Sequence, residues 1–172
     1  KVALARIPDD METDPEIIAL VRRAADHLAD AGYEIVEAEV PDLAGTWKIW
    51  CDILMTELAV LQEAQMRELG SADFGRVLDG FLKAATILDR RGYMEAIATR
   101  SRVLRQWLGF LESYPVILTP LSVKRTPEAN ADLGGDARVH SLFWNDLRFM
   151  SSINVLGLPA AVVPVGLVAG HP

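Results

Sequence analysis

The first 40 residues carry the pattern that most restricts the fold: a strand, a helix and a second strand in direct succession. Residues 2–7 form a short, mostly apolar run. The Thr-Asp-Pro-Glu sequence at 13–16 is typical of a helix start, with either the threonine or the aspartate as the cap. Gly32 is expected to end that helix, and residues 34–40 alternate between polar and apolar. This order predicts a βαβ unit with two parallel strands.

The middle of the chain has helical spacing. Apolar residues recur every three or four positions over 43–69, and a shorter helix weakened by two glycines is expected over 74–89. The clearest stripe runs from Tyr93 to Leu111 at spacings of three and four, interrupted by Arg100. Arg100 is therefore expected to make a polar contact within an otherwise buried face. Cys51 and the tryptophans are interpreted as core residues in these helices.

The last third returns to strand-like patterns. Residues 116–118 are expected to form a buried strand, followed by a long polar loop over 122–139, a helix over 141–153 and a final strand over 160–165. The whole pattern predicts an α/β fold, with a small mixed sheet of about four strands, two of them parallel, covered by four to six helices. Residues 1–41 are the βαβ unit, 42–112 the helical region, and 113–172 the strand, loop, helix and strand.

Composition and charge limit the kinds of partner that this chain is expected to bind. The chain has 172 residues, of which 51% are apolar and 24% charged, as expected for one globular domain. The net charge is −7 and the basic residues are scattered, so nucleic acid is not an expected partner. No apolar run is long enough to span a bilayer, and no membrane association is expected. The single cysteine, Cys51, rules out an intrachain disulfide and fits a cytoplasmic location.

Candidate catalytic residues are scarce in the sequence. No phosphate-binding glycine loop, metal-ligand spacing or Gly-x-Ser-x-Gly motif is present, so no cofactor and no metal is expected. His140 lies near Asp136 and Ser141, but residues so close in sequence rarely form a catalytic triad. The paired serines at 151–152 have bulky neighbours and no glycine to let backbone N–H groups approach a substrate. They are interpreted as part of a helix end.

Four stretches in register resemble the amidase-signature hydrolases. Residues 154–166 are similar to the family's Asn-x-x-Gly-x-Pro-Ala-x-x-x-Pro-x-Gly motif, and residues 116–120 to its strand ending in Thr-Pro. Tyr93, Ala96 and Arg100 match its Tyr-x-x-Ala-x-x-x-Arg helix. The opening strand, with residues 14–16 and 31–33, is similar to the family segment after the catalytic core. The resemblance implies that residues 1–172 are a segment from the C-terminal half of a larger amidase domain.

The resemblance also implies a mechanism. The family hydrolyses carboxylic amides through a Ser–cis-Ser–Lys triad, whose members lie upstream of position 1 in the family's order and match nothing here. No catalytic residue is therefore expected in this chain, and the isolated chain is expected to be inactive. Its contribution to an amide-binding pocket is predicted to be wall residues: Thr119 and Pro120, which follow a sheet strand, and then Trp144 and Asn154. A purely structural role for each is the alternative.

The remaining expectations concern partners. In the intact enzyme the partner is a small-molecule amide, and the isolated chain is expected to associate with itself through apolar surface left uncovered. Two other functions stay open. One is the glutaminase subunit of a tRNA-dependent amidotransferase. The other is a non-catalytic binding or scaffold module that retains the fold.

Overall fold

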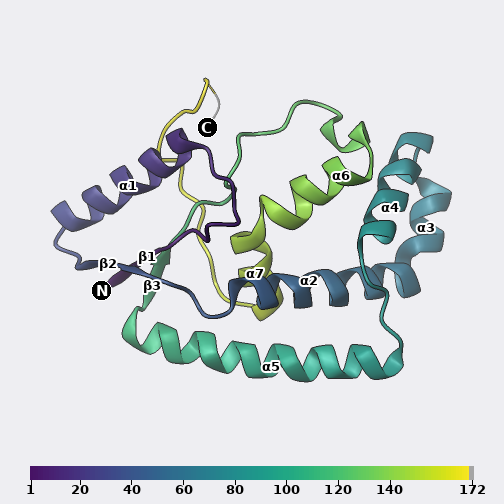
Figure 1. Ribbon diagram of the computed structural model, residues 1–172, viewed down its shortest axis with the longest axis horizontal. Coiled ribbons are helices and arrows are strands. Elements are labelled where there is room, and N and C mark those ends of the chain that lie inside the picture. The colour runs from purple at the N-terminus through teal and green to yellow at the C-terminus, as the bar shows by residue number, and fades with distance from the viewer. Residues whose placement is uncertain (171–172) are drawn as a thin grey trace.

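A three-stranded parallel sheet organises one end of the molecule (Figure 1). The computed structural model describes residues 1–170, without the side chains of 134, 136, 137 and 142–144. Strand β1 (Val2–Ala5) lies at the centre, with β2 (Ile35–Ala38) and β3 (Val116–Leu118) on its two sides. Both pairings are parallel. The α/β class and the parallel βαβ unit are confirmed.

Helix α1 (Pro15–Asp30) connects β1 to β2, and its ends are those that the sequence predicts. The Asp14 carboxylate accepts a hydrogen bond from the backbone N–H of Glu16, which satisfies one of the free donors of the first turn. Gly32 follows the helix with φ of +91°, a conformation that costs a glycine little. The capping aspartate and the glycine therefore fix the length of the crossover.

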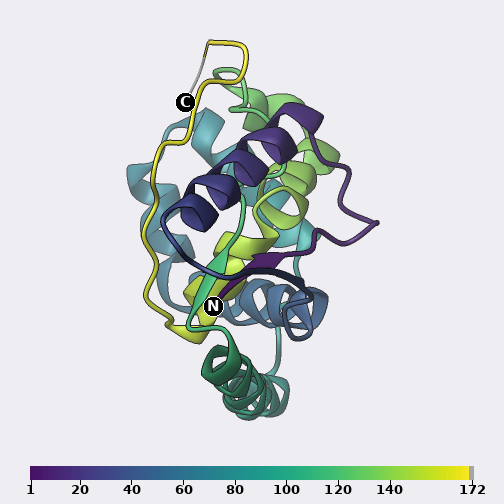
Figure 2. The ribbon, with the colours of Figure 1, turned by 90° about the vertical axis from the view of Figure 1, so that its left-hand side faces the viewer.

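The sheet is smaller than expected and is parallel throughout the described residues, not mixed. The expected strand over 160–165 is wrong: this segment runs in extended form without ladder pairing, past α1 (Figure 2). Pro159 and Pro164 have no backbone N–H to donate, and the carbonyl of Val165 accepts a hydrogen bond from the Arg23 side chain at 2.7 Å. Strand β3 is also an edge strand and not fully buried, with Val116 50% exposed.

The helical region follows the predicted pattern with one irregularity. Helix α2 (Leu43–Glu57) continues through a π-helical turn, η1 (Leu58–Gln62), into α3 (Glu63–Leu69), where one uninterrupted helix was expected. Helix α4 (Ala72–Ala84) begins at a Ser71 cap and ends five residues before the expected position. Helices α3 and α4 lie at the end of the molecule opposite the sheet (Figure 1).

Helix α5 (Arg90–Ser113) runs along the length of the molecule beneath α2 in the view of Figure 1. Its residues Val103 and Trp107 are buried in a core shared with the sheet, α2 and the C-terminal helix α7. The Arg100 guanidinium donates a hydrogen bond to the backbone carbonyl of Val155, so the expected polar contact is confirmed. It caps one of the free carbonyls near the end of α7.

The segment between β3 and the end of the chain contains more helix than expected. A 3₁₀ turn, η2 (Ala131–Gly134), and a short helix, α6 (Asp136–Val139), occupy part of the predicted loop. A second π-helical turn, η3 (His140–Asn145), leads to α7 (Arg148–Leu156). Gly157 ends α7 with φ of +69°, as a corner before Pro159 requires.

Two further sequence interpretations are tested by this fold. Cys51 is a buried residue of α2, and burial raises the pKa of its thiol to about 12, which makes the nucleophilic thiolate scarce at neutral pH. His27 is exposed on α1, as expected for a surface residue. None of the helices in residues 1–170 combines the length and apolar character needed to cross a membrane.

Candidate functional site

The loops that follow β1 and β3 meet at the carboxyl edge of the sheet. Because the strands are parallel, their carboxyl ends point the same way, and open α/β sheets place ligands beyond this edge. The loop after β1 covers residues 6–14, and the loop after β3 begins with Thr119 and Pro120. This edge is therefore the candidate site.

Val123 joins the two loops through its backbone. Its N–H donates to the carbonyl of Asp146 at 3.0 Å, and its carbonyl accepts from the N–H of Asp14 at 2.9 Å. The Val123 side chain is fully buried in the main core. The loop after β3 is thus held on one side by the start of α1 and on the other by the start of α7.

Opposite charges reinforce this junction. Acidic residues between β1 and the first turn of α1 pair with basic residues between β3 and the first turn of α7. We name this set the charge clamp: Asp10 with Arg148, Glu12 with Lys124, and both Asp14 and Glu16 with Arg125. The hydrogen bond from Arg125 lowers the pKa of Asp14. The exposed pairs add little stability individually, but together they fix which loop lies against which.

Arg148 is the buried member of the charge clamp, with 6% of its surface exposed. Its Nη1 donates to Asp10 Oδ2 at 2.9 Å, and its Nη2 donates to Asn145 Oδ1 at 2.8 Å. The guanidinium carbon lies 5.4 Å from the ring centroid of Trp47 on α2, within the range of a cation–π contact. The rings of His140 and the same tryptophan are nearly perpendicular, with 6.4 Å between their centroids.

Asp146 is a buried carboxylate next to this cluster, only 4% exposed. Its Oδ1 has no hydrogen-bond partner among the described residues. Desolvation raises the pKa of Asp146, although the positive charges of Lys124 and Arg138 oppose that shift. A buried acceptor without a donor is energetically costly, so this oxygen would bind an N–H or O–H group that reached it.

Two more buried polar atoms lie on the helices around Arg148. The hydroxyl of Ser152 and the indole N–H of Trp47 have no hydrogen-bond partner among the described residues. The neighbouring Ser151 differs, because its hydroxyl donates to the carbonyl of Leu147 at 2.7 Å. Both serines are fully buried in the middle of α7, so the pair belongs to a helix as expected, but not to a helix end.

The predicted wall residues are distributed over this site unevenly. Thr119 is half-buried, with its hydroxyl 3.1 Å from the carbonyl of Pro120, and Pro120 is buried at the carboxyl edge. Asn154 is exposed in the last turn of α7, eight residues beyond Asp146 and thus roughly 12 Å along the helix axis. The side chain of Trp144 lies outside the described residues. The structure therefore places Asn154 at the opposite end of α7 from the charge clamp.

Sequence reasoning missed the pairing of Asp10 with Arg148 and the burial of Asp146. The acidic density of residues 9–16 was the one available signal, because five carboxylates in eight residues need counter-charges somewhere in the fold. Within the described residues, no group of three or more His, Cys, Asp or Glu side chains is arranged to hold a metal ion.

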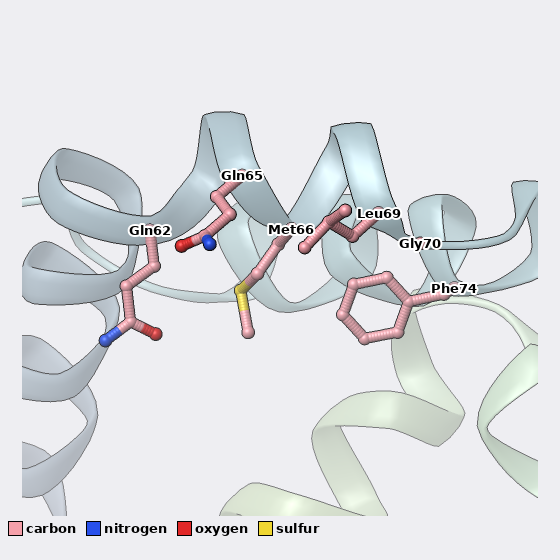
Figure 3. Close-up of a pocket in the computed structure, with 6 residues that line it drawn as sticks. All are labelled: Gln62, Gln65, Met66, Leu69, Gly70 and Phe74. Atoms are coloured by element: carbon pink, nitrogen blue, oxygen red, sulfur yellow. The ribbon is translucent and has the colours of Figure 1, made fainter.

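A separate surface pocket of about 350 Å³ lies at the other end of the molecule, between α3 and α4 (Figure 3). Met66, Leu69 and Phe74 provide its apolar surface, with the amides of Gln62 and Gln65 on the adjoining turn of the helix. None of its described lining residues is ionisable, so they offer binding surface but no group for acid–base chemistry.

Comparison with known proteins agrees with the resemblance found in the sequence. The family model described as Amidase matches residues 1–172. An indoleacetamide hydrolase of Bradyrhizobium japonicum is 49% identical over 172 residues, which is 100% of this chain and 37% of the relative. An amidase of Pseudomonas putida is 29% identical over 89% of this chain and 33% of the relative. A glutamyl-tRNA(Gln) amidotransferase subunit of Cereibacter sphaeroides is 28% identical over 88% of this chain and 36% of the relative.

The chain thus spans about a third of the length of these curated relatives. The family match covers every residue, including the Asn-to-Gly motif at 154–166, the strand before Thr119 and the helix that carries Arg100. The sequence motifs, the α/β architecture and the full-length match agree, and the chain belongs to the amidase-signature family.

Proposed function

We propose that this chain is a non-catalytic C-terminal portion of an enzyme that hydrolyses a carboxylic amide to the acid and ammonia or an amine. The observation that carries the proposal is the 49% identity to an indoleacetamide hydrolase across all 172 residues. A cytoplasmic location is part of the proposal and rests on the single unpaired cysteine, Cys51.

The reaction divides between this chain and the rest of the protein. Water adds its oxygen to the carbonyl carbon, the C–N bond breaks, and the nitrogen leaves with a proton. The family resemblance assigns the nucleophile and base to a Ser–Ser–Lys set that these residues do not supply. The role proposed for this chain is to shape the pocket, with Thr119 and Pro120 on the wall at the carboxyl edge.

Indoleacetamide is the substrate that the proposal favours. Such a molecule offers an apolar ring with N–H donors on the indole and on the carboxamide. The 49% identity to an indoleacetamide hydrolase over all 172 residues supports this choice. Trp144 and Asn154 remain proposed wall residues with smaller contributions.

The test uses the whole protein that contains residues 1–172. Indoleacetamide, propionamide and glutamine are supplied in parallel, and ammonia and the carboxylic acid are both measured. We expect release of indoleacetic acid and ammonia in equal amounts, with the highest kcat/KM for indoleacetamide. Residues 1–172 alone are the control and are expected to release neither product.

Activity on glutamine instead of indoleacetamide, and only when partner proteins are added, would favour the amidotransferase glutaminase, which the 28% identity to such an enzyme allows. A whole protein that hydrolyses none of the three amides would favour a binding or scaffold module. Turnover by residues 1–172 alone would contradict the non-catalytic assignment.

A second part of the proposal concerns the isolated chain. Val162, Val163 and Leu167 are exposed along the extended segment after α7, with Val162 71% exposed, and β3 leaves one edge of the sheet unpaired. Apolar surface and free strand edges of this kind attract a partner. We infer that the isolated chain self-associates, which sedimentation velocity over a range of concentrations would detect.

A further inference from the structure

Arg148 connects both walls of the carboxyl edge. Through Nη1 it holds Asp10, which follows β1, although 138 positions separate the two residues in sequence. Through Nη2 it holds Asn145, whose neighbour Asp146 accepts the backbone hydrogen bond from Val123 after β3. One guanidinium therefore orders a loop from each of two adjacent parallel strands.

The burial of Arg148 is costly for a residue with a purely structural role. Its partner Asp10 has 65% of its side chain exposed, so the buried cation gains little from a screened carboxylate. Its Nε has no hydrogen-bond partner among the described residues. A well-packed apolar side chain would cost less in this position, which indicates that the geometry Arg148 imposes matters beyond stability.

The contacts of Arg148 use properties that lysine lacks. The planar guanidinium makes two hydrogen bonds in different directions while it lies against the ring of Trp47 on α2. An ammonium group is a single point charge and could satisfy one of these partners at a time. Arg148→Lys therefore keeps the charge and removes the link between the loops.

We propose that Arg148 is a positioning residue for substrate binding, which sets the two loops of the carboxyl edge at the spacing that the acyl group of the amide requires. This role rests on the amide-hydrolase function proposed above. If the two loops are held less firmly, the protein binds the substrate and the transition state more weakly by the same amount. Such a loss of binding raises KM and leaves kcat unchanged.

The test compares variants of the whole protein with indoleacetamide as substrate. Arg148→Lys is expected to raise KM about tenfold with kcat within about twofold of wild type. Asp10→Asn is expected to raise KM less than Arg148→Lys does. The double variant is expected to resemble Arg148→Lys, because both substitutions break the same hydrogen bond between Asp10 and Arg148. Arg91→Lys is the matched control, since Arg91 also pairs with a carboxylate, Glu95, but on the exposed face of α5.

Hydrogen exchange of the same variants gives a readout that does not depend on turnover. Arg148→Lys is expected to speed amide exchange in residues 9–14 and 121–125 and to leave α5 unchanged. Should Arg148→Lys fail to fold, Asp10→Asn carries the test, because Asp10 is exposed and its loss leaves the core intact.

An unchanged KM in a folded Arg148→Lys protein would overturn the proposal, as would a fall in kcat at constant KM. Additive effects of the two substitutions would also overturn it. A wild-type protein that hydrolyses no amide would remove the proposed function and this role together. That outcome is distinguishable, because it is seen before any variant is measured.

Discussion

The two ends of this molecule reverse the usual distribution of polar and apolar groups. At the carboxyl edge, Asp146, Arg148 and Ser152 are buried, and each has a polar atom without a hydrogen-bond partner among the described residues. At the helical end, defined as η1, α3 and α4, Leu61 and Leu69 are 73% and 76% exposed. One end buries polar groups at a cost, and the other exposes apolar groups at a cost.

Buried polar groups and exposed apolar groups have two different physical explanations. Buried unpaired polar atoms are energetically costly, so they persist where a ligand or a fixed geometry compensates for them. Exposed apolar side chains in a cluster indicate instead a surface that another part of a larger assembly covers. The carboxyl edge therefore has the properties of a site, and the helical end those of an interface.

The largest expected effect on stability comes from replacing one buried and one partly exposed phenylalanine by alanine. Phe149 on α7 is buried in the main core, so Phe149→Ala is expected to lower the free energy of unfolding by about 3–5 kcal/mol. Phe74 is partly exposed beside the pocket of Figure 3, and Phe74→Ala is expected to cost less than about 1 kcal/mol. Urea denaturation of both variants measures the difference, and equal costs would remove the distinction between the two ends.

A second pair of substitutions examines the backbone at the end of α7 and within α4. Gly157 has φ of +69°, so Gly157→Ala is expected to destabilise the protein by about 1–2 kcal/mol. Gly75 lies within α4, with open space where a Cβ would be, and Gly75→Ala is expected to stabilise it by about 0.5–1 kcal/mol. Thermal unfolding of the two variants should therefore shift in opposite directions.

A third test uses two carboxylates of the carboxyl edge whose pKa values move oppositely. Burial raises the pKa of Asp146 above 3.8, so the folded state binds the proton more tightly than the unfolded state. Its contribution to stability is then lost as pH rises from about that value through the folded pKa. Asp146→Asn is expected to remove this loss and to be at least as stable as wild type at neutral pH.

Asp14 provides the opposite sign. The hydrogen bond from Arg125 lowers the pKa of Asp14, so its contribution is present above the ordinary value of 3.8 and is lost as pH falls through the folded pKa. Asp14→Asn keeps a side chain that can cap the helix, and it should remove only the fall in the free energy of unfolding at acidic pH. The free energy of unfolding of both variants is measured from pH 3 to 8. If both substitutions changed it in the same pH range, the opposite pKa shifts assigned to Asp14 and Asp146 would be contradicted.

The smallest expected effect on stability comes from the helical end. Replacing Leu61 and Leu69 together by glutamine should change the free energy of unfolding by no more than about 0.5 kcal/mol per site, because both side chains are largely exposed. The same change should reduce the binding of a hydrophobic dye, whereas self-association through the segment after α7 and the free edge of β3 should persist. Loss of self-association in this variant would instead place the contact surface at the helical end.

The sequence was most informative where neighbouring residues decide the structure. Asp14, Pro15 and Gly32 set the limits of α1 through local caps, and the stripe around Arg100 showed that one polar contact lay inside a packed face. The four motifs in register, of which 154–166 is one, indicated the family without any structure. Local chemistry and a fixed motif were enough for these features.

The sequence was least informative where contacts between segments that are far apart in the chain determine the structure. Asp10 and Arg148 are separated by 138 positions, and nothing in the spacing of either predicts that they meet. Residues 160–165 have a strand-like composition, but a strand also needs a ladder partner, and none of the described strands pairs with them. Tertiary contacts therefore determined both outcomes.

The buried thiol of α2 makes the chain its own probe of unfolding. Cys51 is the single cysteine, and its pKa of about 12 leaves it nearly inert to alkylating reagents while α2 stays packed. Any labelling at neutral pH must then pass through an opened form, so the labelling rate, divided by that of a free thiol, gives the population of that form. The stability of the helix that supports Arg148 could be followed in this way in dilute solution, without denaturant and without an added chromophore.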